Sequence, residues 1–393
     1  MNRTKCKSTV RPIRRTKVST GTRALHQLGA LRARQTVRLA VSAMLGVMAF
    51  GGATAAMADI TLPAISVGAG MRTGFTDEKV DGAAKSTDDF DLDSVRLYVN
   101  GSVTDNIKFT FNTEYSGDTG GSDANKVEVL DAIARFEYSD GLNIWAGRFL
   151  PPSDRANLHG PYYANEWSVY IDGVQDGYAN VAVGRDDGIA YWGQFFNDML
   201  SVSGGAFSVP STFGTGNIVW AERVMVDLWD PEKGYYLNGT YYGDKNILAI
   251  GVAAQQLAKK NAYDVDFLME RKLGDAGTVS VQGEYAKYEF GGYTGSQSDG
   301  GFGLISYLFP QVVGIGRFEL LAKYSKTTYD FDDGAGVNLG SVGQKTDVAE
   351  LGYVIKEFSA RVSVFYNKVQ FDANDISSLR GYRLFGVGLQ LQM

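Results

Sequence analysis

The chain has 393 residues, with 38 Lys and Arg against 44 Asp and Glu, and one cysteine, Cys6. Residues 1–58 hold eleven of the basic residues and no acidic one, so the remaining 335 residues keep 27 of the 38 basic and all 44 acidic residues, a formal net charge of −17. This balance argues against a nucleic-acid partner, and the lack of cysteine after position 58 excludes disulfides, thiol catalysis and Cys-ligated metal from that part.

The first 58 residues have the composition of a targeting segment. A basic stretch precedes the apolar run "LAVSAMLGVMAFGGATA" at 39–55, and Ala56-Met57-Ala58 offers a small-residue cleavage site. We predict a secretory signal peptide over 1–58, cleaved after Ala58, and one domain over 59–393. No later stretch reaches the ~18 apolar residues that a transmembrane helix needs.

Most of the chain after the leader alternates between apolar and polar residues. In "IKFTFNTEY" (107–115), Phe109 and Phe111 fall on one face and Thr110 on the other, and "ARVSVFYNK" (360–368) separates Val362 and Val364 from Arg361 in the same way. A period of two indicates strands. It fits both a soluble sandwich and a transmembrane barrel that presents one face to lipid and the other to an aqueous lumen.

The connections favour the barrel. Short turns ("TDN", "SDG", "ND", "GDAG") alternate with long polar loops, which is typical of an outer-membrane barrel with short periplasmic turns and long external loops. We therefore predict an all-β, up-and-down antiparallel transmembrane barrel of about sixteen strands. The segment 230–246 is treated as a long periplasmic turn, although an extra hairpin there would make eighteen. The predicted strands are 64–76, 92–104, 107–116, 127–138, 142–149, 187–196, 199–208, 218–229, 247–256, 263–272, 278–290, 301–310, 316–328, 346–356, 359–371 and 382–393.

The chain stops inside an alternating segment, "GYRLFGVGLQLQM". An exposed apolar edge strand invites pairing with other chains, so we expect the last strand to pair with the first and close the barrel. The ending also resembles the carboxy-terminal signal that the barrel-assembly machinery reads, with Gly388, Leu391 and Met393 at matching positions. Met393 stands where that signal usually has an aromatic residue.

Three segments, "VRLYVNGSVTDNIKFTFNTEY", "LDAIARFEYSDGLNIWAGRFLPPSDR" and "GRDDGIAYWGQFF", together resemble the phosphate-selective porin O and P family. The resemblance covers roughly residues 92–196. It implies a trimeric, water-filled channel of sixteen strands. It does not imply phosphate as the solute, because members of that family line their pore with many basic residues and this chain is strongly acidic after its leader.

The longest connection, about 150–186, is the third external loop when strands are counted from a periplasmic amino terminus. We expect it to fold into the barrel and narrow the channel, with a cap on the surface as the alternative. It contains His159, the one histidine after the leader. A Ser–His hydrolase would need this residue as its base, but no nucleophile motif accompanies it, so a pore-lining role is the better interpretation.

Acidic runs at 88–93 and 330–334 hint at calcium. Both lack the spacing of an EF-hand loop, so solvated loops that meet lipopolysaccharide through divalent ions are the preferred interpretation. No resident metal or cofactor is expected.

Charges on the predicted inward faces define the candidate constriction. Basic residues on neighbouring strands would form a stripe down one wall, unless they are scattered and paired with Glu114, Asp131 and Glu137. The acidic third loop would stand opposite, its charge diluted by three arginines, and together they would create a transverse field. The wall residues are Arg72, Arg96, Lys108, Arg135 and Arg361; the loop residues are Asp154, Glu166, Asp172 and Asp176, with Arg148, Arg155, Arg185 and His159.

The function expected from the sequence is passive diffusion of small hydrophilic solutes and ions across a bacterial outer membrane. Selectivity should be weak and lean towards cations, which external acidic loops concentrate at the mouth. An oxyanion-specific porin is one alternative, and an outer-membrane enzyme or a non-conducting structural barrel is another. The expected partners are outer-membrane lipid, lipopolysaccharide, the assembly machinery, small ions and solutes, and further copies of the chain in a homotrimer.

Overall fold

The computed structural model describes residues 64–116, 126–174, 184–208, 218–257, 260–289, 297–332, 338–372 and 379–393. All of them belong to the second of the two units into which the chain divides, Pro63–Met393. The predicted signal peptide and Asp176 lie outside the described residues. None of the helices in the described part of the chain could span a membrane.

The described residues form sixteen strands and two short helical segments. The helical segments are α2 (Arg155–His159) and the 3-10 turn η3 (Gly274–Ala276). The strands are β1 (Ile65–Val80), β2 (Thr87–Ser102), β3 (Ile107–Ser116), β4 (Lys126–Ser139), β5 (Leu142–Phe149), β6 (Asp186–Phe195), β7 (Leu200–Ser208), β8 (Ile218–Asp227), β9 (Ile247–Leu257), β10 (Lys260–Lys272), β11 (Thr278–Tyr288), β12 (Gln297–Val313), β13 (Gly316–Asp332), β14 (Asn338–Lys356), β15 (Ala360–Phe371) and β16 (Tyr382–Gln392).

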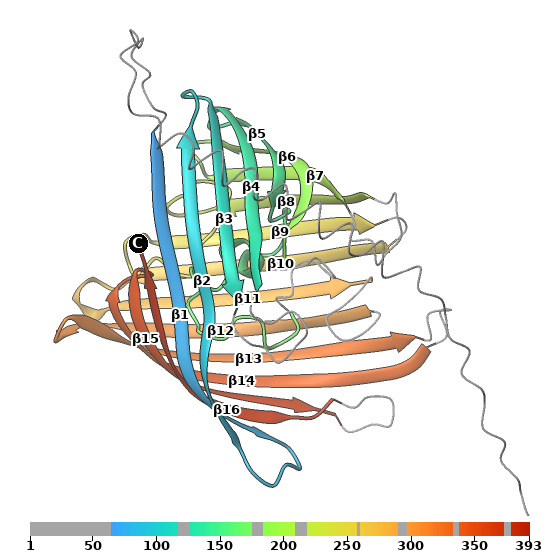
Figure 1. Ribbon diagram of the computed structural model, residues 1–393, viewed down its shortest axis with the longest axis vertical. Helices are drawn as coiled ribbons and strands as arrows, with labels where there is room; N and C mark the ends of the chain where they lie inside the picture. The colour runs from blue at the N-terminus through green and yellow to red at the C-terminus, as the bar shows by residue number, and fades with distance from the viewer. Residues whose placement is uncertain are drawn as a thin grey trace, which may run out of the picture. The chain divides into compact units, whose positions relative to one another are not determined.

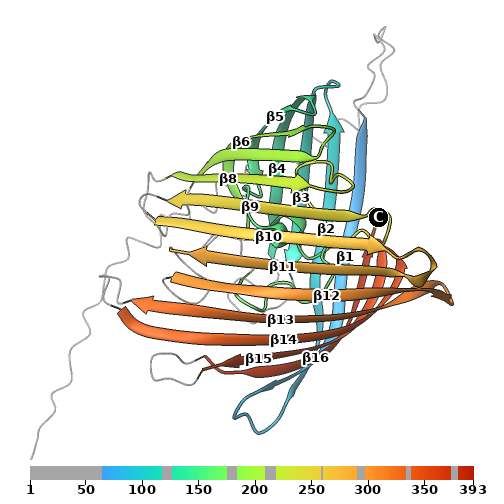
Figure 2. The same cartoon turned by 180° about the vertical axis from the view of Figure 1, so that it is seen from behind.

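Each strand pairs with its neighbours in sequence, and β16 pairs with β1 to close the barrel (Figures 1 and 2). The closing register places Thr73 opposite Leu389 and Gly74 opposite Gly388. The backbone N–H of Met393 also donates to the carbonyl of Ala69 at 2.9 Å. The predicted closure by the last strand is therefore confirmed, and every strand edge is paired.

The sixteen predicted strands are confirmed, and β3 and β5 have the predicted bounds. The alternative of eighteen strands is wrong in the described residues, because 228–246 contains no strand. Strand β14 begins at Asn338, eight residues before the predicted start, and pairs with β13 as far as Asp332. Part of the predicted loop between them is thus a hairpin. The acidic run 88–93 is likewise part of β2.

The predicted faces agree with burial along the strands. On β3, Thr110 is 7% exposed whereas the neighbouring Phe111 is 39% exposed. On β13, the outward Phe318 packs against Tyr353 of β14 near one end of the strand, and Tyr324 is exposed six residues further along. At ~3.3 Å per residue these rings stand ~20 Å apart, close to the ~25 Å apolar band between the aromatic girdles of an outer-membrane barrel.

A charge placed in the middle of this band should oppose folding. Val252 lies midway along β9 on the outward face, opposite the exposed Val224 and Val265 of the adjacent strands. We expect Val252→Arg to lower the free energy of unfolding in lipid vesicles by ~2–4 kcal/mol. Gln256→Arg, on the same face near the end of the strand, should cost only ~0–1 kcal/mol. Equal costs in urea titrations of the two variants would contradict the assignment of this face to lipid.

Candidate pore

The connection after β5 lies inside the barrel, against the inward faces of strands far from it in sequence. It begins with α2, whose first turn is capped by Asp154, because the side chain of Asp154 accepts from the N–H of Asn157 at 2.7 Å. Further along, Lys323 of β13 contacts both Glu166 (2.9 Å) and Asp172 (2.6 Å) of the loop. The described part of the loop, 150–174, is therefore fixed by ion pairs and hydrogen bonds to the opposite wall.

Two predicted wall arginines hold the backbone of this loop. Arg361 donates to the carbonyls of Ala164 (2.8 Å) and Asn165 (3.0 Å). Arg72 donates to the carbonyl of Trp167 at 2.7 Å, and its guanidinium lies 4.1 Å from the centre of the Trp167 ring. Both arginines are buried. They act as clamps for the loop, and their donors are not presented to solutes.

Glycines on β1 and β16 make room for two aromatic side chains of the loop. A Cβ at Gly70 would lie 2.7 Å from the ring of Tyr162, and one at Gly388 would lie 2.5 Å from the ring of Trp167. Both separations are too short for any side chain at these positions. The glycine-rich inner surface of the closing strands is thus a docking surface for the loop.

A second segment enters the barrel from the other end. The β8–β9 connection (228–246) places Glu232 against Arg155 of α2, with Arg155 Nη2 to Glu232 Oε2 at 2.6 Å and both side chains at most 3% exposed. The hydroxyl of Tyr235 donates to the carbonyl of Leu150 at 2.6 Å, and the N–H of Gly239 donates to the carbonyl of Tyr163 at 2.8 Å. We call the loop 150–174 and the connection 228–246 together the inner plug.

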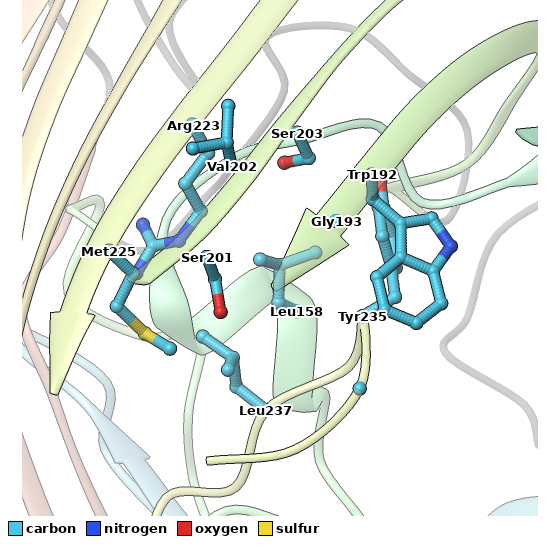
Figure 3. A pocket seen from close by; sticks show the side chains of 11 residues that line it. Leu158, Trp192, Gly193, Ser201, Val202, Ser203, Arg223, Met225, Tyr235 and Leu237 are labelled. Carbon is cyan, nitrogen blue, oxygen red and sulfur yellow. The ribbon is translucent and has the colours of Figure 1, made fainter. Parts of the chain in front are cut away.

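The inner plug packs on one side of the barrel through apolar contacts. Figure 3 shows Leu158 of α2 and Leu237 of the β8–β9 connection gathered with Met225 and Arg223 of β8 around a small cavity of about 30 Å³. Leu158, Leu237 and Met225 belong to one buried apolar cluster. At this contact the inner plug packs directly against β8.

Space remains on the other side, along β2–β5. A cavity of about 740 Å³ lies between this wall and the inner plug, and a second of about 270 Å³ shares Glu137 and Trp192 with it. The inner plug contributes Tyr163 and Tyr236, which are 38% and 36% exposed. From the wall, the larger cavity is lined by Arg96, Tyr98, Asn100, Thr110, Asn112, Asp131, Arg135, Glu137 and Trp145, and the smaller one by Lys108, Glu137, Tyr138, Ser139, Asp140 and Asn143.

The basic residues of this wall are paired with carboxylates. Arg96 Nε lies 2.9 Å from Glu114, and Arg185 Nε lies 3.0 Å from Asp131. Glu137 is shared by two cations, Arg135 at 2.7 Å and Lys108 at 3.0 Å. Arg96 lies over Tyr162 (4.7 Å) and Arg135 over Trp145 (5.1 Å). These ion pairs join four cations to three carboxylates, so the net charge beside the cavities is close to zero.

The structure divides the predicted constriction residues into groups. Arg96, Arg135, Lys108, Arg185 and His159 line the two cavities. Six further residues inside the barrel do not line the cavities named above. They lie within the inner plug or contact it. These are Arg72, Asp154, Arg155, Glu166, Asp172 and Arg361.

Two expectations need correction. Arg148 lies on the face of β5 opposite Trp145 and Phe149, where it donates to the carbonyl of Val129 (3.1 Å) and lies 3.5 Å from the exposed Asp187, so it does not face the interior. The predicted arrangement of a basic wall facing an acidic loop across an opening is also wrong where the inner plug covers the wall. There the loop packs directly on the wall, and its carboxylates Glu166 and Asp172 form ion pairs with Lys323.

Two ionisable groups of the plug are buried, and burial shifts the pKa of each. Burial raises the pKa of Asp154 to about 7, against the opposing effect of its bond from Asn157. Burial also lowers the pKa of His159 to about 4, and its Nδ1 lies 2.9 Å from the carbonyl of Gly160. The imidazole of His159, which lines the larger cavity, is therefore neutral at neutral pH. Among the described residues, no three His, Cys, Asp or Glu side chains are placed to hold a metal ion.

The sequence predicted 230–246 as a periplasmic turn and did not place its residues Glu232, Tyr235 and Tyr236 inside the barrel. It also missed Lys323 as the anchor of the loop. Two signals were available: the connection is far longer than the other short turns, and it is rich in tyrosine. A solvated turn needs neither feature.

Because Trp167 packs on Gly388, substitutions at these two positions should have non-additive effects on the free energy of unfolding. Gly388→Ala should lower the free energy of unfolding by ~1–3 kcal/mol, since the new Cβ overpacks the site. In a Trp167→Ala background the same change should cost almost nothing, which a double-mutant cycle in vesicles would measure. If Gly388 serves only as an assembly signal, the Gly388→Ala defect will persist without Trp167.

The buried His159 predicts acid sensitivity. Between its ordinary pKa of about 6.5 and its folded pKa of about 4, the unfolded chain binds a proton that the folded chain does not. Its contribution to stability is therefore full above pH ~6.5 and is lost as the pH falls towards 4, up to on the order of 3 kcal/mol. The His159→Gln variant should lose less stability than the wild type between pH 7.5 and 4.5. An identical loss in both would contradict the burial of a neutral imidazole.

Comparison with solved structures finds outer-membrane proteins. A high-pH structure of OprB from Pseudomonas putida aligns with a TM-score of 0.58 at 9% identity, covering 84% of this chain and 94% of that one. OmpF of Salmonella typhi in complex with daunomycin aligns at 0.55 and 13%, covering 83% and 97%. An anion-selective porin from Comamonas acidovorans aligns at 0.52 and 14%, covering 84% and 100%.

At these identities the likeness shows the fold. No protein-family model and no curated protein matches the chain, so its resemblance to the phosphate-selective porin O and P family stays a prediction. The closed antiparallel barrel, its apolar outer face and these alignments lead to one conclusion. The chain has the sixteen-stranded fold of bacterial outer-membrane porins.

Proposed function

We propose that the protein is an outer-membrane channel through which small hydrophilic solutes and ions diffuse passively. The observation that supports this most is the unfilled space along β2–β5, where cavities of about 740 and 270 Å³ share Glu137 and Trp192. Solutes pass between the wall and the inner plug. In this proposal, the plug narrows the channel and confines it to one side of the barrel.

We further propose that the channel is only weakly ion-selective. The four ion pairs beside the cavities join four cations to three carboxylates and leave one excess positive charge, while the chain after its leader carries −17. Charges more than ~8–10 Å from the narrow region are largely screened at physiological salt, so the balanced wall sets a small preference. The external acidic residues tilt this preference slightly towards cations.

The proposed partners follow from the fold. The outer face contacts lipid and lipopolysaccharide, the last strand with Leu391 and Met393 is read by the barrel-assembly machinery, and the working form is a homotrimer. No catalytic role is proposed for His159, because its ring is buried and the chain supplies no nucleophile motif beside it.

The channel is tested by recording currents across planar bilayers that contain the refolded protein. Stepwise conductance is expected, and its absence in repeated insertions would favour a structural barrel or an enzyme. Strong block of the chloride current by phosphate would favour the oxyanion-specific alternative.

The selectivity is tested by the reversal potential in a salt gradient. Glu137→Gln removes the carboxylate shared by Lys108 and Arg135, so the potential should shift towards anions. Glu166→Gln, which changes a pair held beneath the loop, is the control and should leave the potential unchanged. Equal shifts would mean that Glu166 faces the conducting path as well.

A further inference from the structure

We propose that the larger cavity, beside β2–β4, binds neutral polyhydroxylated solutes of about monosaccharide size. The inference rests on the proposed channel function, because a solute reaches this cavity through the pore. It concerns which solutes the cavity retains and is separate from the question of whether the pore conducts.

The first argument is the pairing of charges. The guanidinium groups of Arg96 and Arg185 already have carboxylate partners at 2.9 and 3.0 Å, and Arg135 has Glu137 at 2.7 Å. A charged solute must compete with these pairs before it gains an interaction. A hydroxyl group can donate to a remaining carboxylate lone pair and accept from a remaining N–H while the ion pair stays intact. The wall therefore favours many hydroxyls over one charge.

The second argument is a set of polar atoms that lack protein partners. Asn112 Oδ1 and Trp192 Nε1 belong to residues that line this cavity, and both atoms are buried without a hydrogen-bond partner among the described residues. One is an acceptor and the other a donor. Because a hydroxyl both donates and accepts, it can satisfy either atom, and an unsatisfied buried polar group is costly.

The third argument is the aromatic lining on the opposite side. Tyr163 and Tyr236 are partly exposed and line the cavity from the inner plug. The ring of Tyr236 also lies 5.7 Å from that of Trp145. Ring faces receive the C–H face of a pyranose while the paired charges receive its hydroxyls.

The volume is consistent with such a solute. About 740 Å³ lies within the ~300–1,000 Å³ of typical small-molecule sites. A selective oxyanion site would need several unpaired cations, whereas this wall offers one excess positive charge. With its charges paired in this way, the cavity should bind a free anion or cation only weakly.

The test measures block of the ion current in planar bilayers by glucose, with inorganic phosphate and glycine as charged and zwitterionic comparisons. Glucose should reduce the current reversibly and at lower concentration than either comparison. Tyr236→Ala should raise the half-blocking glucose concentration roughly tenfold, equivalent to ~1.4 kcal/mol, while Tyr236→Phe keeps the ring and the affinity. Tyr324→Ala, which changes an exposed ring on the outer face, is the matched control and should have no effect.

Asn112→Leu is the second variant, because it keeps the side-chain volume and removes the hydrogen-bonding atoms. It should also weaken the glucose block. A channel that conducts but is not blocked by glucose, or is blocked better by phosphate, would overturn this inference and leave the proposed function intact. Unchanged block in both Tyr236→Ala and Asn112→Leu would overturn the site. A protein that never conducts would overturn the proposed function and this inference with it.

Discussion

Excising residues 231–245 should raise the single-channel conductance about twofold or more, because a sixteen-stranded barrel encloses an aqueous channel wherever it is not filled. The ends of the excision already meet. The N–H of Asp230 donates to the carbonyl of Asn246 at 2.9 Å, and the N–H of Asn246 donates to the side chain of Asp230 at 2.8 Å. An Asn-Gly turn can therefore join β8 to β9 without disturbing either strand.

The control for this excision is a change at the same end of the barrel. Replacing Asp275 by Asn in the exposed η3 turn between β10 and β11 should leave the conductance unchanged. An excised variant that folds and conducts like the wild type would contradict the assignment of the β8–β9 connection to the interior. The measurement is the current step in planar bilayers at one salt concentration and voltage.

The second large effect concerns the ion pair that joins the two halves of the inner plug. Arg155 and Glu232 form two hydrogen bonds, at 2.6 and 2.8 Å, with side chains 3% and 1% exposed. Removing one partner leaves a buried charge without its counter-charge, so Arg155→Gln and Glu232→Gln should each lower the free energy of unfolding by ~3–5 kcal/mol. The double variant should lose less than the sum.

A nearby pair whose cation is exposed is the matched control. Lys233 lies 2.8 Å from Asp198, but its side chain is 70% exposed, so Lys233→Gln should have little effect on stability. Unfolding by urea in lipid vesicles gives all four free energies under one set of conditions. If the losses from Arg155→Gln and Glu232→Gln simply add, the two residues do not interact in the folded protein.

The strands and their faces could be predicted because a barrel wall imposes one simple rule. Each strand residue points either to lipid or to the interior, so alternation in the sequence identifies the strands and their two faces. Phe111 and Thr110 illustrate this, with neighbouring positions 39% and 7% exposed. The same rule applied to Trp145 and Arg148, three residues apart on β5, would have placed Arg148 on the outer face.

What fills the interior could not be predicted in the same way. Alternation places Arg72 and Arg361 inside, but it does not say whether they meet water or a loop carbonyl. The loop and the β8–β9 connection have no period, and their partners lie up to 228 residues away in sequence. Their positions depend on non-local fits, such as Trp167 against Gly388, which a single sequence does not reveal.

The central claim is that solutes pass along β2–β5 and not along β13, where the loop packs on the wall. Protein made without residues 1–58 has no native cysteine, so a single introduced thiol reports on its own position. Asn100 lines the larger cavity, whereas Ser325 on β13 is 1% exposed and is not among the residues lining the cavities named above. A charged methanethiosulfonate reagent should reduce the current through Asn100→Cys and leave Ser325→Cys unaffected. Reaction and current loss at Ser325→Cys, with none at Asn100→Cys, would contradict this path.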